Sequence, residues 1–301
     1  MKFATFRMDG RRMIGLVDAE AGTVEPLESI LGEPVADMAD LIRRYDDLKA
    51  RIGQGIGQDT GQGGKAIDLS DVEIEAPIPR PARNVMCVGK NYFDHAHEFS
   101  RSGFDSSSRD KSDAIPEVPI IFTKVPESVI ADGQDIVHPG GVSNSIDYEA
   151  ELTVVIGKGG KGITKEQAYG HVWGYTIIND VTARDVQGRH KQWFLGKSFD
   201  TFCPMGPWIV TADELDPASL AVRCWVNDEL RQDANTRDLI FDIPTLIETI
   251  SAGITLQPGD VIATGTPAGV GIGFNPPKFL KSGDTVRIAI SGIGELENRF
   301  A

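Results

Sequence analysis

Residues 145–152 read SIDYEAEL and place three carboxylates, Asp147, Glu149 and Glu151, at alternate positions. The apolar run 152–156 (LTVVI) follows directly. Successive side chains of a β-strand point to opposite faces, so the pattern predicts one strand with its acids on one face and apolar residues on the other. Like charges so close repel each other unless a cation lies among them. The stretch is therefore either a solvated acidic edge or part of a cation site.

Short β-rich runs broken by Pro and Gly lie on both sides of this stretch. They are 84–89, 119–125, 150–157, 171–180, 203–211, 220–228, 260–267 and 284–298. Clear helices are few, and residues 242–253 (DIPTLIETISAG) carry Pro244 near the first turn and Gly253 at the end. So many strands per helix predict an α+β, mostly β protein, arranged as a mixed β-roll.

The first 75 residues differ in style from the rest and predict a small N-terminal α/β domain. Short strands lead into 35–52 (VADMADLIRRYDDLKARI), where the apolar positions have helical spacing, and a Gly/Gln-rich loop follows at 53–66. We therefore predict two domains, 1–75 and 76–301.

Composition excludes several functional classes. The chain has 301 residues, 41% of them hydrophobic and 25% charged, which is typical of a soluble globular protein. A formal net charge of -14 argues against nucleic acid or an anionic membrane as a partner. Three scattered cysteines with no C-x-x-C pair favour a reducing, cytoplasmic location. The sequence contains no run of 18 apolar residues, so it predicts no membrane-spanning helix.

The loop 157–162 (GKGGKG) fits G-x-G-x-x-G but does not predict dinucleotide binding. The helix that would follow it is short and the surroundings are β-rich rather than βαβ, and the motif alone has a high false-positive rate. We interpret it as a surface turn.

The acids of the opening stretch gain a partner about thirty residues later. In 176–187 (TIINDVTARDVQ), Asp180 ends an apolar strand and enters a polar turn that contains Arg184. Two glutamates and this aspartate would form an all-oxygen site suited to Mg²⁺, Mn²⁺ or Ca²⁺ rather than Zn²⁺. The alternative is a solvated acidic face paired with Arg184.

A possible general base lies in 89–99 (GKNYFDHAHEF). His95 and Glu98 are three residues apart, so on a helix they share a face and the carboxylate can orient the imidazole. Such a pair can activate water. The alternative is an exposed helical pair, and His97 would point elsewhere.

Two weaker signals concern anion binding. Lys197 follows the apolar WFLG run and could place a positive charge near an oxyanion, although most lysines lie on the surface. The Gly/Thr-rich turn 263–271 (ATGTPAGVG) could offer N–H groups and the Thr266 hydroxyl to an anion. A plain Gly-Pro turn is the alternative.

Six motifs together resemble the fumarylacetoacetate hydrolase superfamily over about residues 80–301. They are GKNYFDHAHE, PIIFTK, DYEAEL, NDVTARDVQ, GKSFDTFCPMGP and TGTPAGVG, in that order along the chain. The chain is similar to bacterial members with a small N-terminal domain, which include acylpyruvate hydrolases and oxaloacetate decarboxylases. It departs from shorter relatives at 100–117, which lengthens the expected lid.

The resemblance implies a β-roll catalytic domain, a homodimer, a Mg²⁺ or Mn²⁺ ion and a small anionic 2-oxo acid as substrate. By motif match, the metal ligands would be Glu149, Glu151 and Asp180, and His95 with Glu98 would activate water on a lid. It also implies that Arg184 braces the site, that Gln187 and Lys197 contact the substrate, and that Thr266 binds its carboxylate end.

Several functions remain open at this stage. The first hypothesis is hydrolysis of a carbon–carbon bond in an acylpyruvate, through an enolate that the metal stabilises. Oxaloacetate decarboxylation and isomerisation of a hydroxy-diene dioate would use the same metal site. A catalytically idle protein that binds a metabolite is the alternative from another class.

Overall fold

The computed structural model describes residues 1–55, 66–105 and 114–301. The N-terminal part contains β1 (Lys2–Met8), β2 (Arg11–Asp18), β3 (Thr23–Pro26), α1 (Leu27–Leu31), α2 (Met38–Gly55), β4 (Ile67–Asp68) and β5 (Glu73–Glu75). The later strands are β6 (Val85–Gly89), β7 (Ile120–Lys124), β8 (Val129–Ile130), β9 (Ile146–Asp147), β10 (Ala150–Ile156), β11 (Val172–Asn179), β12 (Thr182–Ala183), β13 (Cys203–Thr211), β14 (Ala221–Val226), β15 (Glu229–Asn235), β16 (Val261–Ala263), β17 (Thr285–Ile290) and β18 (Gly294–Arg299). The later helices are α3 (Phe93–Arg101), α4 (Lys165–Ala168), α5 (Arg184–His190), α6 (Phe194–Lys197) and α7 (Ile243–Gly253).

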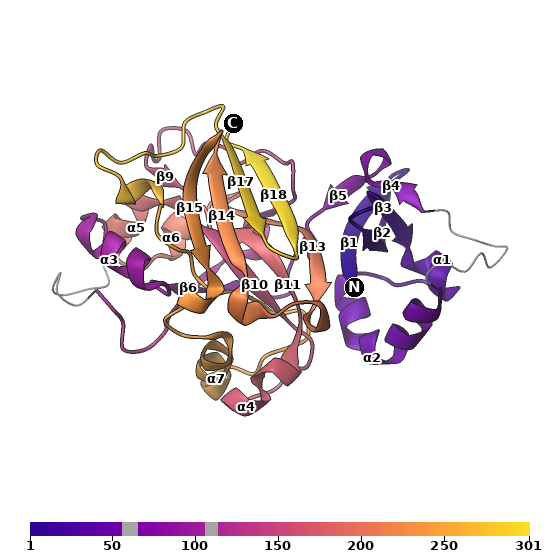
Figure 1. Cartoon of the computed structure of the whole chain (residues 1–301). Coiled ribbons are helices and arrows are strands. Elements are labelled where there is room, and N and C mark those ends of the chain that lie inside the picture. Colours follow the sequence, from indigo (N-terminus) through magenta and orange to yellow (C-terminus); the bar gives the residue numbers. More distant parts are fainter. Residues whose placement is uncertain (56–65, 106–113) are drawn as a thin grey trace.

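Two sheets form the framework of the molecule (Figure 1). The larger runs in the order β4-β3-β2-β1-β13-β11-β10-β16-β6-β7, and the smaller in the order β15-β14-β17-β18. Strands β16 and β6 pair in parallel, whereas β10 pairs with both its neighbours in antiparallel fashion. The predicted α+β, mixed and mostly β architecture is therefore confirmed.

The main core lies where the smaller sheet covers the larger one. Leu152 and Ile177 of the larger sheet belong to the same buried cluster as Val222, Ile288 and Leu296 of the smaller one. Alternating apolar residues in β14 and β17 supply one face of this core, as their sequence pattern requires. The smaller sheet covers the face of β10 that carries Leu152 and Val154, and a second buried cluster includes Val155 of the other face, so β10 is buried along its whole length.

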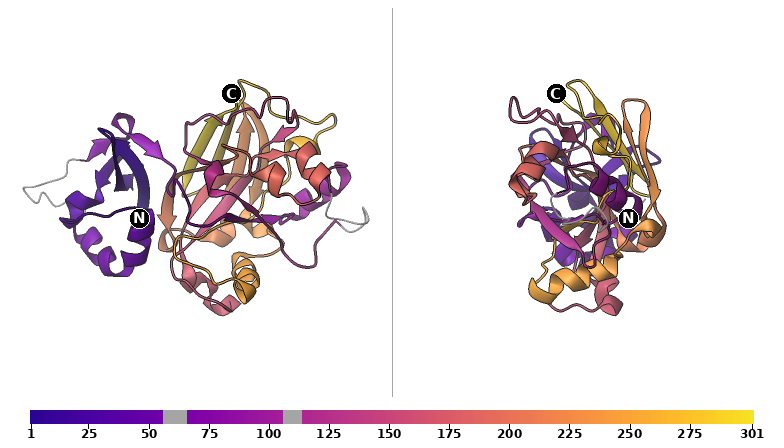
Figure 2. Two further views of the ribbon diagram at one scale, coloured as in Figure 1. Left: turned by 180° about the vertical axis from the view of Figure 1, so that it is seen from behind. Right: turned by 90° about the vertical axis from the view of Figure 1, so that its left-hand side faces the viewer.

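The N-terminal residues form a lobe beside the part of the molecule that contains β6–β18. The view of Figure 1 and the view from behind in Figure 2 both show it. The lobe continues the larger sheet, since β1 pairs with β13 at Phe3↔Ile209. The Phe3 ring stacks on Trp173 at 5.7 Å between centroids. Residues 56–65, most of the predicted loop 53–66, lie outside the described residues. The domain division at 75/76 stays a prediction.

The GKGGKG loop agrees with its interpretation as a turn. It connects β10 to β11, which are antiparallel neighbours, and the helix after it, α4, has only 4 residues. A dinucleotide motif would instead open a βαβ crossover between parallel strands.

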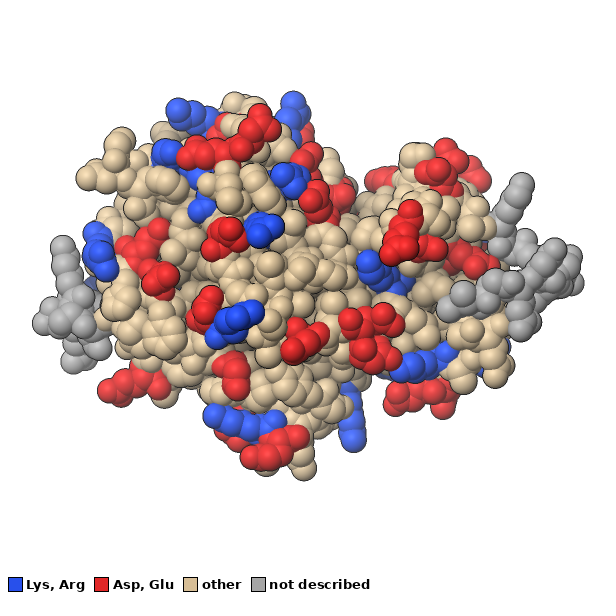
Figure 3. Space-filling model, in the orientation of Figure 1, with Lys and Arg blue, Asp and Glu red and all other residues tan. Residues whose placement is uncertain are grey.

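The visible face in Figure 3 carries Asp and Glu side chains dispersed among Lys and Arg, without a continuous basic area. Such a face offers no extended positive surface for a polyanion. Across residues 1–55, 66–105 and 114–301, no helix has both the length and the apolar character that crossing a membrane requires.

Phe3 packs the N-terminal lobe against Trp173 of β11. We therefore expect Phe3→Ala to lower the free energy of unfolding by about 3–5 kcal/mol, the usual cost of removing a buried phenylalanine ring. Urea denaturation followed by circular dichroism measures this loss. The control is Tyr169→Ala, because Tyr169 is 46% exposed and should cost far less. Equal losses for both variants would contradict the packing role of Phe3.

Candidate active site

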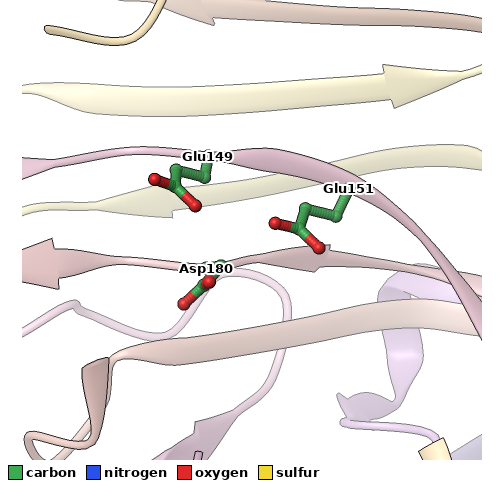
Figure 4. A group of neighbouring side chains, drawn as sticks. All are labelled: Glu149, Glu151 and Asp180. Atoms are coloured by element: carbon green, nitrogen blue, oxygen red, sulfur yellow. The ribbon is translucent and has the colours of Figure 1, made fainter. Parts of the chain in front are cut away.

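Three carboxylates meet at the end of two antiparallel strands (Figure 4). Glu151 lies in β10, Glu149 just before it, and Asp180 directly after β11. The pairing of Glu151 with Ile178 and the Asp180 N–H bond to the Glu149 carbonyl, 2.9 Å, set this geometry. One carboxylate oxygen from each side chain lies within 4.8 Å of the others.

The predicted continuous strand through SIDYEAEL is wrong. The stretch breaks into β9, which pairs with β12, and β10, which pairs with β11, and Tyr148 and Glu149 lie between them. The predicted alternative of a solvated acidic face is also wrong, because Glu149, Glu151 and Asp180 are only 4%, 1% and 0% exposed. The physical reason is that protein covers both faces of this part of the sheet, so alternation does not divide core from solvent.

Buried ammonium groups face two of these carboxylates. Nζ of Lys197 lies 2.8 Å from Oε2 of Glu149 and 2.7 Å from Oδ2 of Asp180. Nζ of Lys124 lies 2.6 Å from Oδ1 of Asp180. Lys197 and Lys124 come from α6 and from the end of β7, so two separate segments supply the compensating charge.

Arg184 balances Glu149 from another side. Its Nη2 lies 2.6 Å from Oε1 of Glu149, and its Nε donates to Oδ2 of Asp147 at 2.9 Å. Burial alone would raise the pKa of Glu149, but Lys197 and Arg184 outweigh burial and lower its pKa to about 2. Glu149 is therefore an anion at neutral pH.

Glu151 has the opposite electrostatic environment. Burial, together with the negative charges of Asp180 and Glu149, raises the pKa of Glu151 well above its ordinary value. The Gly265 N–H donates to its Oε2 at 2.8 Å, which compensates only in part. A divalent cation among the three oxygens would supply the missing positive charge. The all-oxygen donor set fits Mg²⁺, Mn²⁺ or Ca²⁺.

Arg184 and Gln187 come from a helix rather than from the polar turn that the sequence predicts. They lie in α5, and Nη1 of Arg184 donates to Oε1 of Gln187 at 3.2 Å. The helical spacing of three residues places both side chains on the buried face of α5. Both residues reach the same pocket as Glu149 and Lys197.

The predicted helix that carries His95 and Glu98 is confirmed as α3. His95 is buried rather than exposed, and its Nδ1 lies 3.1 Å from Oε2 of Glu98. His97, which the sequence predicts to point elsewhere, is exposed and does not line the pocket that His95 reaches. Residues 106–113, part of the lid extension expected at 100–117, lie outside the described residues.

One pocket brings most of the predicted residues together. Its lining comprises Val88, Gly89, Lys90, His95, Phe99, Phe122, Glu149, Arg184, Gln187, Trp193, Lys197 and Thr266. Glu98 reaches this pocket only through His95. Glu151 and Asp180 lie beside Glu149, behind the lining. The aromatic rings of Phe99, Phe122 and Trp193 form the apolar wall of this pocket, with the Arg184 guanidinium 5.7 Å from the centre of the Phe99 ring and Nζ of Lys197 4.9 Å from that of Phe122.

Sequence reasoning missed Lys124 and Gln232. Lys124 ends the PIIFTK motif, and a charge that closes a buried strand is a signal that could have identified it. Gln232 had no signal, because it lies in the polar stretch of β15 and only the fold buries it. Its Nε2 donates to Oγ1 of Thr266 and to the carbonyl of Pro267, both at 2.8 Å. Gln232 thereby orients Thr266.

The chain is similar in sequence and structure to several known proteins. The family model "Fumarylacetoacetate (FAA) hydrolase C-terminal" matches residues 84–301. Oxaloacetate tautomerase YisK of Bacillus subtilis is 46% identical over 311 residues, which span 100% of both proteins. The solved fumarylacetoacetate hydrolase EaFAH of Exiguobacterium antarcticum is 40% identical, with a TM-score of 0.81 over 100% of this chain and 99% of that one. Maleylpyruvate hydrolase of Sphingobium sp. SYK-6, solved with manganese(II) and pyruvate, is 32% identical in sequence. Its structure matches with a TM-score of 0.79 and covers 100% of this chain and 99% of that one.

Glu151→Gln keeps the shape of the side chain but removes a charged oxygen donor, so we expect Mn²⁺ affinity to fall by about 10- to 100-fold or more. The variant should melt above the wild type in EDTA at about pH 8, and this difference should shrink toward about pH 5. A carboxyl whose pKa is raised by folding stabilises the folded state below its unfolded-state pKa. That stabilisation is lost as the pH rises through the folded-state pKa. Glutamine does not titrate and avoids the loss.

Titration calorimetry with Mn²⁺ and melting curves in EDTA measure the two effects. Glu20→Gln is the control, because Glu20 is an exposed acid far along the chain from the cluster. Unchanged Mn²⁺ affinity in Glu151→Gln would contradict a cation site at these carboxylates.

Proposed function

The chain belongs to the fumarylacetoacetate hydrolase superfamily, and on that premise we propose that it is a divalent-metal-dependent enzyme that enolises a small 2-oxo dicarboxylate, with oxaloacetate tautomerisation as its first activity. The similarity to oxaloacetate tautomerase YisK spans both chains completely and supports this choice of reaction. The manganese(II) and pyruvate bound to the maleylpyruvate hydrolase support the choice of metal and of a 2-oxo acid.

One observation carries the proposal. Glu149, one of the three clustered carboxylates, and His95, which Glu98 contacts, line the same pocket, although they come from elements far apart in the sequence. A metabolite-binding protein that performs no chemistry would not need a buried histidine oriented by a carboxylate. When bound, the cation supplies positive charge that stabilises an enolate of the substrate.

His95 is the proposed acid–base group. If Nδ1 donates to Oε2 of Glu98 at 3.1 Å, Nε2 is the nitrogen left to accept a proton. In this role, His95 takes a proton from the carbon next to the 2-oxo group, and the oxo oxygen takes up a proton to complete the enol; the reverse reaction returns the proton from His95 to the carbon. Glu98 keeps the imidazole in one tautomer and one orientation.

The remaining lining residues bind the anionic substrate. The amide of Gln232 donates to Oγ1 of Thr266, so the hydroxyl hydrogen of Thr266 stays available for a substrate carboxylate. In this proposal Lys197 and Gln187, which line the same pocket, contact the oxo group, and Arg184 holds Glu149 in position. The apolar wall of Phe99, Phe122 and Trp193 excludes water from the reacting atoms.

Hydrolysis of an acylpyruvate is the second candidate, favoured by the same His95–Glu98 pair. His95 would then take a proton from a water that attacks the distal carbonyl, and the carbon–carbon bond would break to release pyruvate as its enolate. Oxaloacetate decarboxylation and diene-dioate isomerisation use the same metal site and remain candidates. A homodimer and a cytoplasmic location also stay predictions.

His95→Ala removes the proposed acid–base group but leaves the carboxylate cluster intact. We expect oxaloacetate tautomerisation in Mn²⁺ to fall by about 10²- to 10⁴-fold, while Mn²⁺ affinity stays unchanged. Ultraviolet absorbance of the enol follows the reaction. His97→Ala is the matched control, because this histidine lies two residues away on the exposed side of α3.

The same assay decides between the candidate functions. Wild-type protein is tested with oxaloacetate and with an acylpyruvate, in Mn²⁺ and after chelation. Faster turnover of the acylpyruvate would replace the tautomerase proposal with the hydrolase. No turnover across the panel, together with no Mn²⁺ binding, would leave the idle binding protein as the better description.

A further inference from the structure

Both carboxylate oxygens of Glu98 have defined partners. Oε2 lies 3.1 Å from Nδ1 of His95 within α3. Oε1 accepts a hydrogen bond from the backbone N–H of Gly269 at 3.0 Å, in the segment that follows β16. The side chain that orients His95 therefore also attaches α3 to this segment.

The backbone of Gly269 is held rigidly. Its φ is +102°, a value that favours glycine, and its carbonyl accepts a hydrogen bond from the Tyr148 hydroxyl at 2.8 Å. A Cβ at this position would lie 1.8 Å from the backbone oxygen of Arg231. The Gly269 N–H, which donates to Oε1 of Glu98, is therefore held in one position.

The next residues tie this segment to the carboxylate cluster. The N–H groups of Gly271 and Ile272 donate to the two oxygens of Asp147, at 2.6 and 3.1 Å. Asp147 precedes Glu149 by two residues and also binds Arg184. The segment that receives α3 is therefore built on the stretch that carries the candidate metal ligands.

Gly273 has a different reason to be glycine. Its φ lies outside the left-handed range, so its backbone does not require glycine. A Cβ there would lie 1.7 Å from Oε1 and 2.2 Å from Cδ of Glu98. These atoms are the end of a flexible side chain. An open groove lined by Glu98, Gly273, His97 and Phe274 would receive Glu98 if it were displaced.

We propose that Gly269–Gly273 is the docking segment of α3, and that Gly273 is a positioning residue whose missing side chain leaves the space that Glu98 occupies. Through Glu98, Gly273 sets the orientation of His95. The docking of α3 is independent of the reaction, whereas its catalytic consequence rests on the proposed function.

Gly273→Ala tests the docking directly. We expect amide hydrogen exchange across Phe93–Arg101 to become at least about 3-fold faster, because α3 loses its contact with Gly269. Gly253→Ala is the matched control, since a Cβ there would meet nothing within 4 Å among the described residues. Exchange in α3 that is unchanged in Gly273→Ala would overturn the proposal.

Kinetics test the positioning of His95. Gly273→Ala should lower kcat by about 10- to 100-fold with little change in KM, because a small misplacement of a catalytic group has effects of this size. In a Glu98→Ala background, Gly273→Ala should change kcat by less than about 2-fold, since its target is already absent. Additive losses would overturn the role of Glu98 as the intermediary.

Two further outcomes are distinguishable. If Gly273→Ala does not fold, Glu98→Ala alone removes the same contact and must accelerate exchange in α3, and unchanged exchange would overturn the docking. If the wild type turns over no 2-oxo acid, the proposed function fails, but the hydrogen-exchange comparison still decides whether α3 docks on Gly269–Gly273.

Discussion

The burial of three carboxylates within 4.8 Å of one another is the constraint on which the site depends. Buried charges are costly unless they are paired, so positively charged side chains must lie next to these carboxylates. Lys124, Lys197 and Arg184 come from the end of β7, from α6 and from α5. The site therefore exists only in the folded β-roll, which brings these segments together.

Asp147 extends this network from the carboxylate cluster to the segment that contacts α3. Its carboxylate holds Arg184 on one side and the N–H groups of Gly271 and Ile272 on the other. The segment that receives Glu98 is thus fixed relative to Glu149. The position of α3 relative to the carboxylate cluster is consequently fixed, which the proposed proton transfer between a bound substrate and His95 requires.

Much of the framework could be predicted from local pattern. The predicted strands, the helix at 242–253 and the helical face shared by His95 and Glu98 follow from periodicity and from start and stop residues. They agree with β6, β7, β10, β11, β13, β14, β16, β17, β18, α7 and α3. The break between β9 and β10 could not be predicted. It arises because the two halves of SIDYEAEL pair with different strands, which is a property of the sheet and not of the stretch.

The sequence by itself determined the residue types of the site: acids at alternate positions, a His-x-x-Glu pair, and a lysine after an apolar run. Only the tertiary structure decided that Glu149, Glu151 and Asp180 are buried together, that Lys124 and Gln232 belong with them, and that Glu98 contacts Gly269. The physical reason is that charge compensation acts through space. Its partners lie in segments whose distance along the chain carries no information about their distance in the fold.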